Sequence, residues 1–386
     1  AAPSSASRSP SSPGAGSAPP AFKLDLLRIE NGTIVYRDKA AGTVERIESL
    51  TADISAASLA GPFTFDGRLS ARGIPLTLSG RVNRFAEQGA VPFRASIGTP
   101  GTATEIGLAG TVTDIETSPS VAAKLSGEGD DLGALVRAFS GSAVPPQLSQ
   151  AFTISASIKA TDAAVSLGQL VFQLGDTAVN GNANIEIKDG PKADVALRIK
   201  TLNIDALPAT TTGPGPKGAA AIPPAGGTNA QPASAAAQKF ELPAGIEANV
   251  GLTIDEVIAK KGRIRGVRLA ASLKDGAVTV NTLEAGFPGG GQLSLSAWLT
   301  APQGTLAYGG RVSFRSTSLR TVLEWMEVDI AAVPADRLRR FNVRADISGD
   351  ASQVQIANIA SQLDASRMSG GVTVALRERT AFGASF

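Results

Sequence analysis

One group of acidic residues in the chain is spaced closely enough to suggest a cation site. Glu128, Asp130 and Asp131 lie within four residues of one another. Carboxylates are ligands of Ca²⁺, but the residue spacing of an EF-hand loop is absent. The following residues, LGALVRAF, form a short helical pattern, and Asp is a favoured N-cap residue. We therefore expect a helix over 131–139 capped by Asp130 or Asp131, and Ca²⁺ binding is the less favoured alternative.

Two short basic runs are the next candidates, at residues 260–265 (KKGRIR) and at Arg337, Arg339 and Arg340. Such runs can meet lipid headgroups. They also occur on solvated strand edges, where positive charge discourages aggregation. We favour the strand-edge interpretation for both runs.

Glycine-containing motifs give two further candidates. Residues 289–291 (GGG) follow Pro288 and precede a strand pattern rather than a helix, which predicts a turn or bulge and argues against a phosphate-binding loop. Residues 31–33 (NGT) formally match a glycosylation site. The Asn-Gly pair inside an apolar run predicts a hairpin turn instead.

Other catalytic chemistry is restricted by composition. The 386 residues contain no His and no Cys, which excludes Ser-His-Asp triads, cysteine nucleophiles and His or thiolate zinc sites. No local pair of carboxylates suggests glycoside hydrolysis. A formal net charge of +2 predicts no bulk attraction to nucleic acid. We expect a protein that is not an enzyme and that needs no metal or other cofactor.

Low-complexity segments divide the chain. Residues 1–20 and 208–238 consist largely of Ala, Pro, Ser, Thr and Gly, and such segments cannot bury enough apolar area to order themselves. We expect a disordered linker over 1–20 and either a linker or a long loop leaving a sheet edge over 208–238. Residues 21–207 and 239–386 carry the regular patterns. No apolar run approaches the roughly 18 residues of a membrane span. The chain begins at Ala1 rather than Met and shows no apolar signal-peptide core, so we expect a piece of a longer protein.

Within the patterned regions, apolar and polar residues alternate with a period of two, for example over 154–159 (ISASIK) and 293–299 (LSLSAWL). This alternation predicts strands with one apolar face. The pairs Asn31-Gly32, Asp66-Gly67 and Asp275-Gly276, together with residues 189–191 (DGP), predict the turns of an antiparallel meander. Helical patterns are limited to 131–139, to 318–328 with Ser318 as N-cap, and to a possible third helix over 335–341.

The chain also resembles itself. Similar strand–turn–strand units begin at Ile106, Ala178, Gly289 and Met368, and the last is cut off at the end of the sequence. The phrase from Phe152 (FTISASIKATDAAVSLGQLVFQL) matches the phrase from Phe341 (FNVRADISGDASQVQIANIASQL) in spacing and apolar positions. Repeated hairpins that cannot bury their apolar faces alone must stack along one axis.

The most specific motif lies near the start. Residues 24–38 read LDLLRIENGTIVYRD, and they are followed by IESL at 47–50, SLAGP at 58–62 and a glycine-bounded strand at 74–80. This order resembles the AsmA family of bacterial envelope proteins, including its TamB-type members, over about residues 22–386 apart from the linkers. The resemblance implies a periplasmic protein anchored in the inner membrane, whose long twisted sheet is bent into an open groove, or half-barrel. It further implies a role in outer-membrane biogenesis by phospholipid transport, with outer-membrane components as further partners.

The residue pattern also favours a lipid-binding surface, independently of the family resemblance. Too few helices are predicted to cover one long apolar face, so a second sheet, curvature of the sheet or an apolar ligand must cover it. Phospholipid acyl chains would supply such cover without reactive groups. Alternation predicts that the groove is lined by Ile154, Ala156, Ile158, Leu197, Ile199, Leu293, Leu295, Val343, Ile347, Val372 and Val374. The alternative is a scaffold or regulator of outer-membrane protein assembly that carries no lipid. A carbohydrate-active enzyme on a β-solenoid is a more remote third class.

Overall fold

The computed structural model describes residues 23–38, 43–85, 89–140, 144–188, 190–205, 245–375 and 381–385. The two predicted linkers, 1–20 and 208–238, lie outside these residues.

Strands dominate the described residues, as predicted. The N-terminal strands are β1 (Leu24–Asp38), β2 (Thr43–Ala56), β3 (Phe63–Ala71), β4 (Ile74–Val82), β5 (Val91–Gly98), β6 (Glu105–Thr113), β7 (Ser120–Gly129), β8 (Phe152–Ala160), β9 (Ala164–Leu174), β10 (Thr177–Glu186) and β11 (Lys192–Asn203). The C-terminal strands are β12 (Glu247–Ala259), β13 (Gly262–Lys274), β14 (Ala277–Phe287), β15 (Gly291–Thr300), β16 (Ala307–Ser316), β17 (Phe341–Asp350), β18 (Gln353–Leu363), β19 (Ser366–Ala375) and β20 (Ala381–Ser385). Two α-helices, α1 (Leu132–Ser140) and α2 (Leu319–Trp325), and three 3₁₀ turns, η1 (Pro146–Leu148), η2 (Pro288–Gly290) and η3 (Pro302–Gly304), complete these elements.

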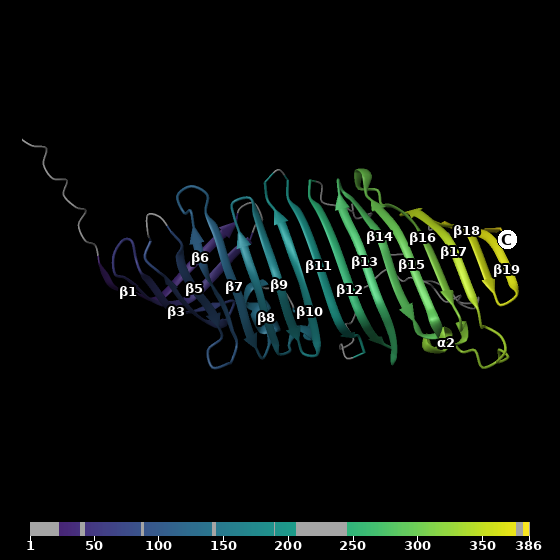
Figure 1. Ribbon diagram of the computed structural model, residues 1–386, viewed down its shortest axis with the longest axis horizontal. Coiled ribbons are helices and arrows are strands. Elements are labelled where there is room, and N and C mark those ends of the chain that lie inside the picture. Colours follow the sequence, from purple (N-terminus) through teal and green to yellow (C-terminus); the bar gives the residue numbers. More distant parts are fainter. Residues whose placement is uncertain are drawn as a thin grey trace, which may run out of the picture.

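The strands form one long, twisted sheet in which each strand pairs with the next along the chain (Figure 1). The pairs are antiparallel except for β11 and β12, which run parallel with Lys192 opposite Glu247 and Asn203 opposite Ile258. Strands β1 and β19 lie at opposite ends of the sheet (Figure 1), so the sheet is open. The predicted fold class, a long antiparallel sheet of repeated hairpins with a few short helices, is confirmed.

The parallel pair determines where the helices lie. From β7 to β16 every pairing is antiparallel except the parallel pairing of β11 with β12, and the number of antiparallel pairings is even. Strands β7 and β16 therefore point the same way. Helix α1 follows β7 and helix α2 follows β16, and both therefore lie at the same long edge of the sheet. We call this the helix edge; the strand ends on the other side form the opposite edge.

The predicted turns were partly correct. Asp275 and Gly276 have φ angles of 51° and 68° and connect β13 to β14, as an Asp-Gly hairpin turn requires. The triglycine turn was also correct, because Gly289 and Gly290 lie in η2 between β14 and β15.

Two of the dipeptides are not turns. Asn31 has a φ of 51° inside β1, where the register with β2 shifts between Ile29 and Gly32, so the motif forms a bulge and the strand continues. Asp66-Gly67 lies within β3. A Cβ on Gly67 would be 3.0 Å from the Thr51 carbonyl oxygen and 3.2 Å from the Cβ of Ala52, so this glycine permits close contact with β2.

The predicted third helix over 335–341 is wrong. Pro334 precedes a loop in which Leu338 has a φ of 60°. The carboxylate of Asp364 accepts hydrogen bonds from the backbone N–H groups of Leu338 (3.1 Å), Arg339 (3.0 Å) and Arg340 (2.9 Å). These bonds hold the loop against the β18–β19 turn and remove the donors that a helix would need.

The strand-edge interpretation of residues 260–265 is also wrong. This run spans the β12–β13 hairpin, and both strands have a neighbour on each side within the sheet. Asp205 accepts hydrogen bonds from the backbone N–H groups of Lys260 (2.6 Å) and Lys261 (2.8 Å).

None of the helices in the described ranges combines the length and apolar character needed to cross a membrane.

Candidate functional site

The residues predicted to line a groove all lie on one face of the sheet. Residues directly opposite each other in a ladder share a face, so the register can be followed from strand to strand. Ile154 lies opposite Phe172, Leu197 opposite Leu252, and Leu295 opposite Val312. The same rule places the predicted groove residues of β8, β11, β15, β17 and β19 together. We call this surface the apolar face and the other surface the polar face.

The apolar face is only partly covered. Of the predicted groove residues, Ala156 is buried and the others are half-buried. A residue in a closed sandwich core would be buried on that side by a second layer. In the described ranges, the only helices that could provide such cover are α1 and α2, and both lie at the helix edge.

Helix α1 covers the apolar face of the N-terminal half at the helix edge. Asp131 caps the helix, because its Oδ1 accepts the backbone N–H of Ala134 at 3.0 Å; the capping interpretation of the acidic cluster is confirmed. Leu135 packs into a buried cluster with Leu76 and Phe152, which are exposed by 3%, 1% and 3%. Burying a side chain of this size contributes roughly 1.5–3 kcal/mol, so α1 is firmly seated on the sheet.

Helix α2 closes the same edge of the C-terminal half. Ser318 accepts the backbone N–H of Thr321 as the predicted N-cap. The ring of Trp325 lies 5.7 Å from that of Phe287, and its Nε1 donates to the carbonyl oxygen of Ala259 at 2.9 Å. The ring centroid of Phe314 lies 6.2 Å from that of Phe287 and 6.3 Å from that of Phe341. Aromatic side chains therefore line the apolar face beneath α2.

At the opposite edge, the apolar face of the N-terminal strands is hollowed. A cavity of about 530 Å³ lies over β2 to β7. The apolar side chains that line it come from strand ends and from two connecting loops: Ile54, Phe63, Phe65, Val82, Phe85, Val91, Phe93, Val112, Ile115 and Val121. Phe85 and Ile115 are exposed by 42% and 43%.

The groove residues predicted from sequence begin at Ile154 and miss this hollow. The signal was present, because Phe63 and Phe65 alternate with Thr64 and Asp66 as the later strands do. Phe85 and Ile115 had no such signal, since they lie in the connections outside the strands and join the hollow through the tertiary structure alone.

The polar face carries ion pairs between neighbouring strands. Arg28 contacts Asp53 with Nε–Oδ1 and Nη2–Oδ2 distances of 2.7 and 2.9 Å, and this hydrogen bonding holds the pKa of Asp53 below its ordinary value. Arg198 contacts Asp255 at 2.9 Å. These pairs are solvent-exposed and screened by water, so each contributes little to stability.

Within the described part of the chain, no group of three or more acidic side chains is placed to hold a metal ion. The apolar face offers apolar contact over a long surface, bounded by helices at one edge. Comparisons with models of known protein families, with curated proteins and with solved structures found no match to this chain.

Proposed function

We propose that the apolar face binds the acyl chains of phospholipids and that the protein contributes to phospholipid transport between membranes and to outer-membrane biogenesis. The observation that carries the proposal is that one face of the sheet presents apolar side chains from β8 to β19, most of them half-buried, with helical cover at one edge only. Exposed apolar patches larger than a few hundred Å² are uncommon on monomeric proteins and mark binding surfaces.

The chemistry of the face suits an acyl chain. Leu, Ile, Val and Phe side chains supply dispersion contacts and exclude water, which is what a methylene chain needs from its binding site. The polar headgroup has to remain in water. The edge without helices leaves room for this, and the hollow of about 530 Å³ at that edge has the size of a small-ligand site.

The location in the cell follows from the resemblance to the AsmA family in residues 24–80. In this proposal the chain is the periplasmic part of a protein anchored in the bacterial inner membrane. The strand order supports a conduit more than a closed container, because an open sheet of consecutive hairpins presents the same apolar face at every step along its length.

Native mass spectrometry of the protein purified from bacterial membranes in mild detergent tests the proposal, together with extraction and identification of bound lipid. We expect phospholipid to be retained. Protein that carries no phospholipid after purification and takes up none from vesicles would contradict the proposal and favour a scaffold that carries no lipid.

A further inference from the structure

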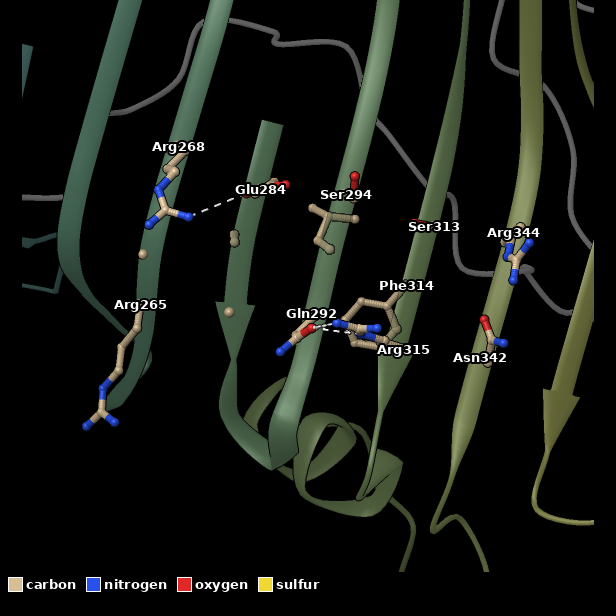
Figure 2. Close-up of a pocket in the computed structure, with 14 residues that line it drawn as sticks. Arg265, Arg268, Glu284, Gln292, Ser294, Ser313, Phe314, Arg315, Asn342 and Arg344 are labelled. Atoms are coloured by element: carbon tan, nitrogen blue, oxygen red, sulfur yellow. Dashed lines mark hydrogen bonds and ion pairs between the residues drawn. The ribbon is translucent and has the colours of Figure 1, made fainter. Parts of the chain in front are cut away.

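The polar face carries a second hollow, which the proposed function does not use. It has a volume of about 640 Å³ and lies over β13 to β17. Figure 2 shows the polar side chains around it, contributed by neighbouring strands. This volume is within the range of small-molecule sites in proteins.

The register builds the hollow from two adjacent cross-strand rows. One row runs from Arg268 through Glu284, Ser294 and Ser313 to Arg344. The other runs from Arg265 through Gly286, Gln292 and Arg315 to Asn342. Gly286, Ser294 and Ser313 are small residues inside the rows, whereas Arg265, Arg268 and Arg344 lie at row ends and Arg315 lies beside Gln292 within the second row (Figure 2).

The charge of this hollow is not balanced as it is at several other arginines of the polar face. Arg28, Arg198 and Arg311 each contact an aspartate on a neighbouring strand. The hollow instead contains four arginines and one glutamate, an excess of three positive charges.

The single glutamate leaves most of this charge unpaired. Glu284 lies 3.7 Å from Arg268. Arg315 donates to the neutral side chain of Gln292 (Figure 2). In the part of the chain that the structure describes, Arg265 and Arg344 form no ion pair. Arginines clustered without acidic partners repel one another, and an anion would relieve that repulsion.

We propose that this hollow, the arginine hollow, binds a small ligand that carries two or more phosphate groups. The planar guanidinium group donates two parallel hydrogen bonds to phosphate oxygens. Ser294, Ser313 and Asn342 add neutral donors between the arginines, which suits a ligand with many acceptor oxygens. The arginine hollow lies on the opposite face from the acyl-chain site, so this proposal stands or falls independently of the proposed function.

Isothermal titration calorimetry of the full chain with inorganic tripolyphosphate tests this assignment. We expect saturable binding that weakens as salt is added. Arg315→Gln and Arg344→Gln should each weaken binding roughly tenfold or more, because each removes charge-assisted hydrogen bonds. Both side chains are exposed, so both variants should keep the unfolding temperature of the parent. Lys159→Gln, which removes one exposed charge from the polar face at β8, is the matched control and should leave binding unchanged.

Three results would overturn the proposal. The first is the absence of saturable binding, or equal binding by the parent and both arginine variants. The second is equally tight binding of citrate, which would show that phosphate is not specifically recognised. The third is arginine-dependent binding to vesicles containing phosphatidylglycerol without any binding of tripolyphosphate, which would make the surface a membrane contact.

Discussion

Gln169 of β9 and Asn358 of β18 occupy the same position in two equivalent hairpins, and each has a backbone φ of 51°. In both hairpins the strand register shifts near this residue, between Ser155 and Ser157 in β8 and between Arg344 and Asp346 in β17. The same β-bulge therefore occurs in both copies of the repeat. A bulge increases the local twist of a strand, so its repetition helps to shape the long sheet.

This bulge predicts that two substitutions of Gln169 differ in their effect on the free energy of unfolding. Valine is β-branched and disfavours the left-handed region, so Gln169→Val should lower the free energy of unfolding by about 1–2 kcal/mol. Gln169→Gly should not lower it, because glycine adopts this φ without strain. Denaturant unfolding measures both changes. Gln173→Val, at an exposed extended position of the same strand, is the control, and an equal loss in Gln169→Val and Gln173→Val would contradict the strain argument.

The seating of α1 predicts a large effect at Leu135. Leu135→Ala leaves a cavity beside Leu76 and Phe152 and should lower the free energy of unfolding by about 2–4 kcal/mol. Arg137→Ala changes the same helix at an exposed position, where Arg137 lies 3.6 Å from Asp131, and should cost about 0–1 kcal/mol. Thermal unfolding of both variants distinguishes them, and similar losses would show that α1 does not anchor the face as described.

Much of the fold could be predicted because its determinants are local. Period-two alternation predicted the groove residues on single faces of their strands, and the register confirms that they share one face of the sheet. The caps at Asp131 and Ser318 were equally readable, since an N-cap depends on the residues of a single turn.

The errors arose where structure depends on distant partners. An Asn-Gly pair forms a turn or a bulge according to whether the next strand continues the pairing, and at Asn31 it continues with β2. The alternation of β11 and β12 is the same in parallel and antiparallel ladders, so the parallel pair was not predictable. The arginine hollow was missed for a related reason: alternation places Arg315 and Arg344 on a face, but only the register places them in neighbouring rows.

The Asp346 carboxylate predicts a pH-dependent contribution to stability. The amide of Asn358 donates to its Oδ2 at 2.8 Å and Arg311 Nε donates to its Oδ1 at 3.0 Å, and these contacts lower the pKa of Asp346. Because the folded-state pKa is depressed, the stabilisation is fully present above the unfolded-state value of about 3.9 and is lost as the pH falls through the folded-state pKa.

An NMR titration of the Asp346 carboxyl carbon checks this prediction. The pKa should rise toward its ordinary value in Asn358→Gly, which removes the amide donor and keeps a residue that accepts the left-handed φ. Gln169→Gly makes the equivalent backbone change in the other hairpin and should leave the pKa of Asp346 unchanged. An unchanged pKa in Asn358→Gly would show that the amide does not stabilise the carboxylate.

Charge placed on the apolar face should separate lipid binding from folding. Leu295→Glu introduces a carboxylate onto a half-buried position of the apolar face, whereas Ser296→Glu places it on the exposed polar face next to it. We expect both variants to fold, with cooperative unfolding and unchanged circular dichroism, and only Leu295→Glu to lose retained phospholipid in native mass spectrometry. A Leu295→Glu variant that unfolds would instead indicate a closed core, as a scaffold without a lipid path would have.

The most direct measurement is photo-crosslinking in living bacteria with a benzophenone amino acid placed at paired positions on the two faces. The pairs are Ile158 with Lys159, Leu295 with Ser296, and Val372 with Thr373, each consisting of an apolar-face residue and its polar-face neighbour. We predict phospholipid adducts, identified by mass spectrometry, at the apolar-face residue of every pair and at none of the neighbours. Adducts absent from all six positions, or equally abundant on both faces, would contradict the claim that the apolar face carries acyl chains.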